Sequence, residues 1–483
     1  MQIRSEIPSI RYALEKNRRD IVDILEKVLQ RITPSKEEEE RVLSFAKRLK
    51  QEITHIVERS GIDAEVTIEG SVAKGTWLPD NVDFDIFIIV DYRPGVNKEE
   101  FFLEILNTIR SGLDHQFELR YAEHPYLRGL IEGFEVDIAP AYKAPPQDII
   151  SSFDRTPHHT KYVISKLTPA LANEVRLLKA FLRGIDAYGA EIKIGGLSGY
   201  ACELLIIYYG SFIKTIEEFA NNKRIYVDLT KTWRKKDAFK KFQHHFILVD
   251  PTDRNRNVGS ALRLDVWNKI RLMSNLFLEK PLFEFFYPTD IDVSLGEIRK
   301  ILRGRNVVLI VFEKDLDVTQ DVYWGQALRI MKKVYDEFSR SIFRVISIDA
   351  FETDKYIVML LETCYKKHPS VVKLVGPPID AGIDHIFRFY NKHKNNIISG
   401  PWIENNRLCV LVQYGKVSIV EHVKEFISSV KTRPSFLSFE VLESEQDIIS
   451  FIKQNHCEKS AYKAIRRGDI HNLLAKVLDE GET

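Results

Sequence analysis

The chain has 483 residues, of which 44% are hydrophobic and 29% are charged, and its formal net charge is +1. This composition indicates a soluble, well-packed protein of three or more domains whose surface is not basic overall, so only local patches could bind nucleic acid. No apolar run reaches the roughly 18 residues of a membrane span, and the first residues lack a signal-peptide core, so we expect a cytoplasmic protein without a membrane segment.

The first 60 residues are predicted to form two helices. Residues 1–30 repeat apolar side chains at helical spacing. Ser35 then caps a second helix, whose first turn holds the acidic run Glu37–Glu40, as suits the positive end of a helix dipole. That helix is expected to continue to about Ser60.

The following segment is predicted to be a small mixed sheet flanked by helices. Apolar, β-branched runs indicate strands near residues 64–69, 82–90, 116–121 and 134–139. A helix is expected near residues 97–113, between the second and third strands.

A glycine-serine turn lies between the first two of these strands. Gly70 and Ser71 offer backbone N–H groups and a hydroxyl to a phosphate. Asp83 and Asp85 open the next strand, and alternate residues on a strand point the same way, so both carboxylates share one face. Adjacent carboxylates repel unless a cation lies between them, and a hard divalent cation such as Mg²⁺ prefers oxygen ligands. A phosphate cradle beside an acidic metal site predicts phosphoryl transfer.

A third carboxylate strengthens this interpretation, because an Asp-x-Asp pair alone is more often a solvated turn or strand end. Asp137 lies in a strand that follows the turn at Gly133, and Glu135 shares its face as the rival ligand. A site for two metal ions needs about three carboxylates.

The second half of the chain is predicted to mix helices and strands. Pro140 to Pro146 is expected to be a linker, and residues 150–280 are expected to be mainly helical. Further elements are expected as a strand at 306–313, a helix at 321–339, strands at 341–348 and 356–363, and a C-terminal helix at 459–480. The four cysteines are widely separated and indicate neither a disulfide framework nor a zinc site.

Three basic clusters stand out against the balanced overall charge. They are Lys231, Arg234, Lys235, Lys236, Lys240 and Lys241 with Trp233, Phe239 and Phe242 between them; Arg299, Lys300, Arg303 and Arg305; and Lys459, Lys463, Arg466 and Arg467. Each is either an RNA-contacting surface or a solvated helix face, and both readings stay open.

Several segments recur in an order that resembles a known family. They are Asp154-Arg155-Thr156-Pro157-His158-His159, Asn173-Glu174-Val175-Arg176-Leu177-Leu178-Lys179, Tyr188-Gly189-Ala190-Glu191, Gly196-Leu197-Ser198-Gly199-Tyr200, and Asp250-Pro251 through Arg256-Asn257-Val258. Together with Gly70-Ser71 and the three aspartates, they resemble the archaeal class I CCA-adding enzymes, tRNA nucleotidyltransferases of the DNA polymerase β superfamily. The resemblance is dense over roughly residues 60–265 and thinner beyond. No single motif is decisive, but the ordered set is highly specific.

The resemblance implies a role for individual residues. Asp83, Asp85 and Asp137 would hold two Mg²⁺ ions, and Asp137 would also help to activate the attacking hydroxyl of the RNA 3′ end. The other matched residues would bind ATP or CTP: Ser71, Lys74, His159, Lys179, Tyr188 and Arg256. Lys74 stands where the family usually has arginine, so it would neutralise phosphate as a point charge, without the bidentate fork of a guanidinium.

The same residues have more ordinary interpretations when the resemblance is set aside. Lys179 lies beside an apolar helix face, where a lysine is usually solvated. His158 and His159 are adjacent and so point apart, and at least one of them is expected to be structural. Tyr188 follows a short helix, where an aromatic residue is more often a cap or part of the core.

The predicted fold class is α+β and multidomain. We expect a polymerase β-like nucleotidyltransferase head with a small mixed sheet over residues 1–145, a helical neck that contacts nucleotide and tRNA over 146–280, and an α/β C-terminal body and tail that bind tRNA over 281–483. The predicted function is template-independent addition of C, C and A to the 3′ end of tRNA from CTP and ATP, with release of pyrophosphate. A homodimer is also expected from the resemblance.

Two alternative functions remain open at this stage. Poly(A) polymerases and oligoadenylate synthetases share the serine and the three carboxylates, but they would not use CTP. A non-catalytic tRNA-binding protein on a retired transferase fold is less consistent with a chain that keeps all three carboxylates and the Gly70-Ser71 turn.

Overall fold

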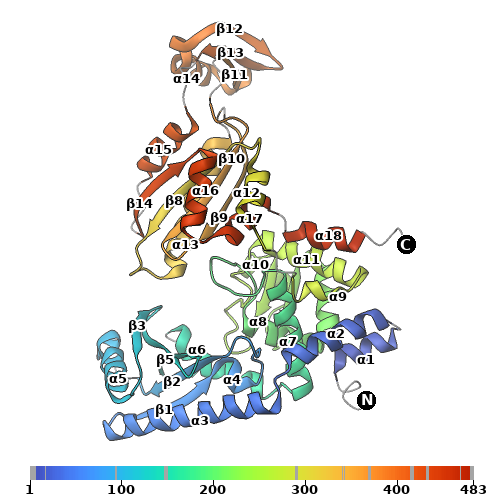
Figure 1. Ribbon diagram of the computed structural model, residues 1–483, viewed down its shortest axis with the longest axis vertical. Helices are drawn as coiled ribbons and strands as arrows, with labels where there is room; N and C mark the ends of the chain where they lie inside the picture. Colours follow the sequence, from blue (N-terminus) through green and yellow to red (C-terminus); the bar gives the residue numbers. More distant parts are fainter. Residues whose placement is uncertain are drawn as a thin grey trace. The chain divides into compact units, whose positions relative to one another are not determined.

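The computed structural model describes residues 7–16, 18–92, 95–145, 151–288, 292–339, 341, 343–367, 371–413, 418–430, 435–467 and 469–478 (Figure 1). Helices and strands alternate through most of the chain, which confirms the predicted mixed α+β class. Among the residues that the structure describes, no helix has both the length and the apolar character needed to cross a membrane.

The N-terminal helical region contains two helices where one was predicted. The helices α1 (Pro8–Glu15) and α2 (Arg19–Ile32) are separated at Arg18, where the backbone is not helical, while residues 1–6 and 17 lie outside the described part. The Arg18 guanidinium donates to the Leu278 carbonyl oxygen at 2.8 Å, which fixes the turn. Both helices pack into one core, so their apolar spacing alone did not reveal the break.

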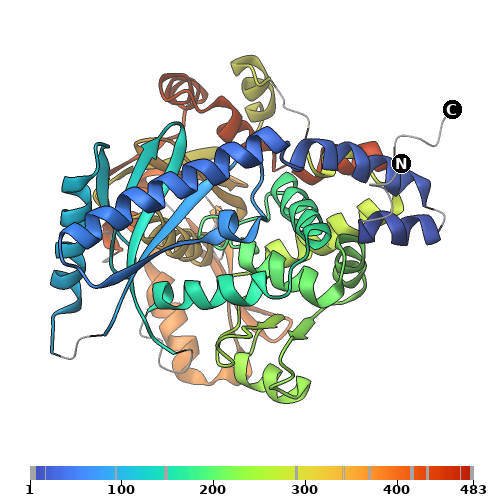
Figure 2. The same ribbon diagram turned by 90° about the horizontal axis from the view of Figure 1, so that it is seen from below.

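The predicted cap of the next helix, α3 (Lys36–Arg59), is confirmed. The Glu38 N–H donates to Ser35 Oγ at 3.2 Å, and the Ser35 N–H donates to Glu38 Oε2 at 2.7 Å. This reciprocal capping box satisfies two backbone donors and fixes where the helix begins. The helix then runs along the neighbouring sheet and packs Phe45 against it (Figure 2).

A five-stranded mixed sheet carries the predicted carboxylates. Its strand order is β1-β2-β5-β4-β3, with β2 and β5 parallel and the other neighbours antiparallel. The strands are β1 (Ala64–Glu69), β2 (Asp83–Val90), β3 (Phe117–Tyr121), β4 (Pro125–Ile131) and β5 (Phe134–Tyr142). Helices α3 and α5 (Lys98–Gly112) share a core with the sheet, which includes Phe84, Phe102 and Ile138.

Two sequence predictions for this sheet were wrong. Strand β4 was not predicted, and β5 extends to Tyr142, so Pro140 lies in a strand rather than in a linker. Proline is tolerated there because the pairing of β4 with β5 ends at Ile138 and does not reach Pro140. Pro146, the far end of the predicted linker, lies outside the described residues.

The region from residue 151 to 280 is mainly helical, as predicted. Its helices are α6 (Ser152–Ile164), α7 (Pro169–Gly184), α8 (Gly199–Tyr209), α9 (Phe212–Asn221), α10 (Lys235–Phe242) and α11 (Leu264–Glu279). A two-stranded parallel sheet of β6 (Ile225–Asp228) and β7 (Phe246–Val249) was not predicted, because strands of four buried residues carry little periodicity.

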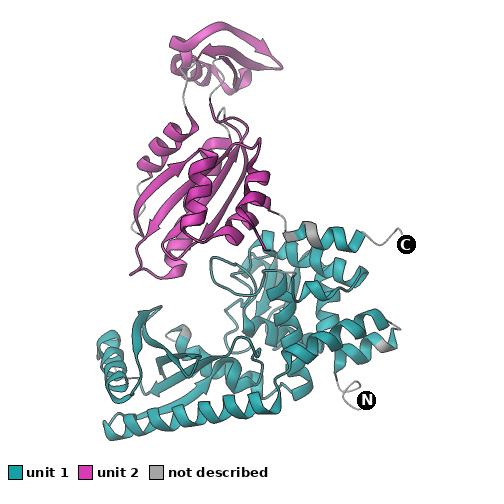
Figure 3. Cartoon of the chain, viewed as in Figure 1, with its two compact units in different colours: residues 1–289, 470–483 teal, residues 290–469 magenta. Residues whose placement is uncertain are grey.

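The chain divides into two compact units, residues 1–289 with 470–483 and residues 290–469 (Figure 3). The predicted C-terminal helix is therefore two helices: α17 (Glu458–Arg466) belongs to the second unit, and α18 (Asp469–Leu478) packs Leu473 into the core of the first. They are separated at Arg467, which has a left-handed backbone (φ 51°). Residues 479 and 480 of the prediction lie outside the described part. The expected domain boundaries at 145 and 280 stay predictions.

The second unit contains two antiparallel sheets. A four-stranded sheet has the order β14-β8-β10-β9 and a three-stranded sheet has the order β11-β13-β12. The strands are β8 (Val307–Lys314), β9 (Val345–Glu352), β10 (Tyr356–Thr363), β11 (Val371–Pro378), β12 (Ile397–Glu404), β13 (Arg407–Gln413) and β14 (Phe436–Leu442). The accompanying helices are α12 (Leu295–Leu302), α13 (Gln320–Ser339), α14 (Ile383–His393), α15 (Ile419–Ser429) and α16 (Glu445–Gln454).

In and beside the larger sheet, β8, α13 and β10 lie where they were predicted, and β9 begins later than predicted. Strand β8 is buried on both faces, with Ile310 in one core and Leu309 in the other, which explains its continuous apolar sequence. The strand expected at 341–348 begins only at Val345, because Phe343 is buried in a turn and Arg344 has a left-handed backbone (φ 45°).

Glu174 is a fully buried carboxylate that joins three helices of the first unit. It accepts hydrogen bonds from the Ser9 N–H (2.7 Å), the Ser9 hydroxyl and the Phe212 N–H (2.6 Å). We expect Glu174→Gln to destabilise the unit by about 2 kcal/mol, because an amide cannot accept from all three donors. The melting temperature should fall by roughly 4–8 °C in a thermal-shift assay. Glu15→Gln, at an exposed carboxylate of α1, is the control and should leave it unchanged.

Candidate active site

The carboxylates of β2 and β5 lie side by side on one face of the sheet. The parallel register pairs Asp83 with Glu135 and Asp85 with Asp137, and paired residues of neighbouring strands point to the same face. All four residues line a cavity of about 430 Å³. The structure therefore brings together the three predicted aspartates, with the rival Glu135 beside them.

The predicted glycine-serine turn is the start of a short helix, α4 (Gly70–Lys74), which also lines this cavity. Gly70 has a left-handed backbone (φ +67°), and a Cβ atom there would lie 1.8 Å from Asp85 Oδ2. Glycine is thus required for two reasons, the backbone conformation and the close approach to the carboxylate. Ser71 follows it at the wall of the cavity.

The crowding of carboxylates disfavours their ionisation. Burial raises the pKa of Asp85 to about 7, and the neighbouring charges of Asp137 and Asp83 contribute to the increase. Burial also raises the pKa of Asp83, with repulsion from Glu135 and Asp137 as the next causes. A divalent cation would relieve this repulsion, and the hard oxygen ligands of Asp83, Asp85 and Asp137 suit Mg²⁺.

Arg128 supplies the positive charge that lies closest to this cluster. It stands opposite Asp137 in the antiparallel register of β4 and β5, and its Nε and Nη2 atoms donate to the two Asp137 oxygens at 2.7 and 2.5 Å. Among the described residues, no three carboxylate, imidazole or thiol groups already converge on one metal position. A cation bound here would therefore have to share Asp137 with Arg128 or displace the guanidinium.

Two of the predicted nucleotide ligands meet at a buried carboxylate on the other side of the cavity. Lys74 Nζ lies 2.8 Å from Glu203 Oε2, and Lys179 Nζ lies 4.0 Å from Glu203 Oε1. Thr76 joins them, since its hydroxyl donates to Glu203 at 2.7 Å and its carbonyl oxygen accepts from Lys179 at 2.9 Å. Lys179 is thus a buried residue rather than the solvated lysine that its helix position alone suggested.

The loop after α4 is held in place by a buried arginine of α7. Arg176 donates to the carbonyl oxygens of Trp77 and Gly75 at 2.9 and 2.7 Å. Burial lowers the pKa of Arg176 to about 10, which still leaves the guanidinium charged at neutral pH. The segment between Lys74 and Asp83 is therefore fixed by side chains from a different part of the chain.

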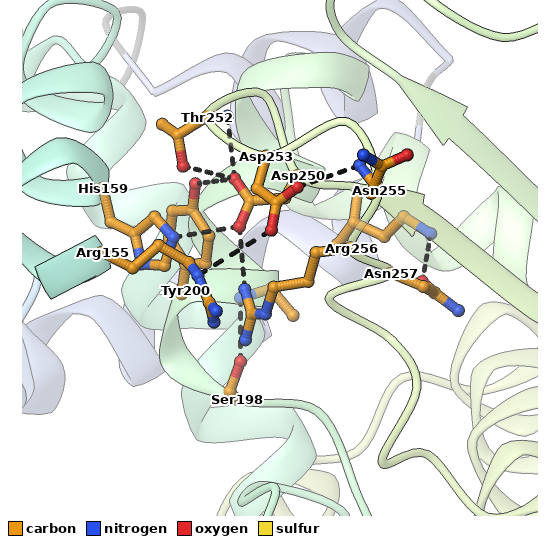
Figure 4. Close-up of polar contacts among 12 residues, drawn as sticks. Arg155, His159, Ser198, Tyr200, Asp250, Thr252, Asp253, Asn255, Arg256 and Asn257 are labelled. Atoms are coloured by element: carbon orange, nitrogen blue, oxygen red, sulfur yellow. Dashed lines mark hydrogen bonds and ion pairs between the residues drawn. The ribbon is translucent and has the colours of Figure 1, made fainter. Parts of the chain in front are cut away.

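His159 and Arg256 both contact the carboxylate of Asp250 (Figure 4). His159 Nε2 and Arg256 Nη1 lie 3.0 and 2.9 Å from Asp250 Oδ2, and the Tyr200 hydroxyl donates to Oδ1 at 3.1 Å. Burial opposes the ionisation of Asp250, but hydrogen bonds from His159 and Thr252 hold its pKa well below the usual range. An ionised carboxylate only accepts, so the proton lies on His159 Nε2.

The predicted site residues therefore fall into two groups. Lining the cavity are Ser71, Lys74, Asp83, Asp85, Asp137, Lys179 and Tyr188. His159 and Arg256 do not line it, but Tyr200 does, and its ring stacks on the His159 imidazole with centroids 3.9 Å apart. His158 has a different partner, with Nε2 2.7 Å from the Ala144 carbonyl oxygen.

Sequence reasoning assigned no role to Arg128, Glu203 or Asp250. Arg128 carried no signal, because its strand was not predicted and its partner depends on the register of β4 with β5. Glu203 had a detectable signal: it is the single charge in the apolar run Ala201-Cys202-Glu203-Leu204-Leu205-Ile206, and a buried charge needs a partner. Asp250 likewise follows directly on the buried strand β7.

Comparisons with known proteins give a consistent family. Three family models match: a nucleotidyltransferase domain over residues 46–159, the second domain of tRNA nucleotidyltransferase over 173–287, and the C-terminal domain of CCA-adding enzyme over 303–433. A CCA-adding enzyme from Picrophilus torridus is 33% identical over 92% of this chain and 98% of its own length. One from Methanocaldococcus jannaschii is 37% identical over 74% of this chain and 81% of its own.

A solved structure with a much lower identity also aligns with the chain. The Cid1 poly(U) polymerase, bound to MgATP, covers 55% of this chain and 95% of its own, with a TM-score of 0.43 and 15% identity.

The raised pKa of Asp85 makes the stability of the metal-free protein depend on pH. Its folded pKa of about 7 lies above the ordinary value of 3.8, so ionisation of Asp85 lowers stability as the pH rises from 4 through 7. Asp85→Asn removes this cost. In thermal-shift assays with EDTA, we expect the variant to melt higher than the wild type by a margin that grows from pH 5 to pH 8. A margin that stays constant with pH would contradict the assigned pKa.

Proposed function

Because the chain belongs to the archaeal CCA-adding enzymes, we propose that the cavity between Asp83, Asp85 and Asp137 is where nucleotides are joined to tRNA. The chain adds C, C and A to the 3′ end of tRNA from CTP and ATP, without a nucleic-acid template. The observation that carries the assignment to this cavity is the parallel register that gathers the carboxylates beside Gly70.

The reaction is an in-line displacement at the α-phosphate of the incoming nucleotide. The 3′-oxygen of tRNA forms a bond to that phosphorus, the bond to the pyrophosphate oxygen breaks, and the hydroxyl proton is lost. Asp83, Asp85 and Asp137 would hold two Mg²⁺ ions, which would lower the pKa of the hydroxyl and stabilise the charge on the leaving oxygens. Asp137, on the central strand of the sheet, would also help to activate the attacking hydroxyl.

The remaining residues of the cavity position the nucleotide. We assign the triphosphate to Ser71, Lys74 and Lys179, and the sugar to Tyr188, because these residues line the same cavity as the carboxylates. His159, which stacks on Tyr200, is assigned with them to positioning the triphosphate and sugar. Arg256, which shares Asp250 with His159, is assigned to nucleotide selection. Positioning and charge stabilisation are nearly all that the protein must supply for phosphoryl transfer.

The family match separates this function from its alternatives. Poly(A) polymerases and oligoadenylate synthetases share the carboxylates. The family models of tRNA nucleotidyltransferase and CCA-adding enzyme match residues 173–287 and 303–433 of this chain, outside the segment that carries the carboxylates. Use of CTP is the corresponding experimental distinction. The expected homodimer and cytoplasmic location stay predictions, and light scattering during size-exclusion chromatography tests the homodimer.

We expect Asp83→Ala and Asp85→Ala to abolish addition of all three nucleotides while leaving tRNA binding largely intact, because both side chains serve the reaction centre. Incorporation of labelled CTP and ATP measures the activity, and we expect it to fall by roughly 1,000-fold or more when the metal ligands are lost. A filter-binding assay measures tRNA binding in parallel. Asp91→Asn, at an exposed residue just after β2, is the matched control and should retain activity. Full incorporation of CTP by either alanine variant would refute the metal assignment.

The basic cluster on α10 is proposed as a contact for the tRNA backbone. Its lysines, Lys235, Lys236 and Lys240, are exposed. The interleaved aromatic residues Trp233 and Phe242 are partly buried and pack against Ile247. The exposed lysines therefore supply the contact that the proposal rests on, through their charge.

In each of the other two basic clusters, an arginine makes hydrogen bonds within the second unit. Arg305 forms a bidentate pair with Glu362, with both contacts at 2.7 Å, and also donates to the Ile465 carbonyl oxygen. Arg466 donates to the Tyr462 hydroxyl at 2.6 Å. These contacts favour a structural role for both arginines.

Replacing Lys235 and Lys236 together by alanine should weaken tRNA binding by several-fold and lower the slope of log Kd against log salt by about 2, because each lysine neutralises about one phosphate. Filter binding of tRNA over a salt series measures both quantities. The matched control replaces Lys47 and Lys50, which are exposed on α3, and should leave the slope unchanged. An equal effect in both pairs would contradict a specific contact at α10.

A further inference from the structure

A single buried carboxylate, Glu203, lies between the two lysines of the cavity. Only 1% of its side chain is exposed, and the Lys74 and Lys179 side chains are 7% and 4% exposed. Glu203 Oε2 contacts Lys74 at 2.8 Å, while Oε1 accepts from the Thr76 hydroxyl at 2.7 Å and lies 4.0 Å from Lys179. Three charged side chains are thus held together at the wall of the cavity, where burial reduces screening by water.

The fold gives these three groups no freedom to separate. Glu203 belongs to α8, Lys179 to α7 and Lys74 to α4, and α7 and α8 pack through a continuous core. Lys179 is further fixed by the Thr76 carbonyl oxygen at 2.9 Å. A buried carboxylate without partners would cost several kcal/mol, so the site is stable only with the lysines in place.

We propose that Glu203 is a positioning residue for the triphosphate of CTP and ATP, which holds the Lys74 and Lys179 ammonium groups in place at the cavity wall. The inference rests on the proposed function, namely that this cavity binds the nucleotide. Two ammonium groups and one carboxylate leave one net positive charge, directed at the same cavity as the aspartates. In this role Glu203 acts through the lysines and does not contact the reacting atoms.

The effect of Glu203 on the pKa of Lys179 supports this role. Burial lowers the pKa of Lys179, and Glu203 is the group that most opposes this effect. The other groups that act on Lys179 are Cys202, Lys74 and Arg176, and the last two lower its pKa further. Burial also raises the pKa of Glu203. The nearby charges of Lys74 and Lys179 more than offset this and hold that pKa below its usual value. Without Glu203, Lys179 should therefore lose its proton at a lower pH than in the wild type.

The test compares Glu203→Gln with the wild type in steady-state CTP incorporation from pH 7 to pH 9. We expect the variant to show a KM for CTP at least tenfold higher, increasing further with pH, with a much smaller change in kcat. Glu203→Asp, which keeps the charge, should recover part of the loss. The matched control is Glu174→Gln, a buried carboxylate outside the cavity, which should lower the melting temperature and leave KM and its pH profile unchanged.

A wild-type KM and pH profile in Glu203→Gln would overturn the inference, and so would an equal increase in KM in Glu174→Gln. If Glu203→Gln shows no cooperative melting, Thr76→Val decides, because it removes the hydroxyl that orients Glu203 and keeps the volume. A KM for CTP raised several-fold and dependent on pH supports the proposal, and an unchanged KM overturns it. Failure of the wild type to use CTP would instead refute the proposed function itself.

Discussion

The parallel, in-register pairing of β2 with β5 is the constraint on which the site depends. It brings Asp85 beside Asp137 and Asp83 beside Glu135, so that like charges share one face of a sheet. The cost of this arrangement appears in the raised pKa of Asp85, whose first cause is burial. Such a cluster is stable enough to persist only because the rest of the unit supplies positive charge and fixed backbone around it.

The compensating groups come from elements other than the two strands that carry the cluster. Arg128 reaches Asp137 from the neighbouring strand, and Lys74 and Lys179 approach from two helices and share Glu203. Arg176 holds the carbonyl oxygens of the intervening loop. The two lysines are thus themselves held by a buried partner, which keeps them ordered before a nucleotide arrives, as catalysis by positioning requires.

Local sequence patterns predicted those features whose physical cause is local. Ser35 and Glu38 form a cap within one turn, and Asp83 and Asp85 share a face because of the two-residue period of a strand. Features that depend on how separate elements pair or pack were missed. Arg128 required the register of an unpredicted strand, and Glu203 has partners 129 residues and about 24 residues away in the chain, on α4 and α7. The turn at Arg18 was missed because both flanking helices face one core.

The most direct test of the account is the nucleotide requirement of the reaction on a tRNA that ends at the discriminator base. Labelled CTP and ATP are supplied separately and together, with Mg²⁺ or with EDTA. We predict that the protein adds two C residues from CTP, and then a single A when ATP is present, and that both steps require the metal. Long A tails made without CTP, or equal incorporation in EDTA, would contradict it.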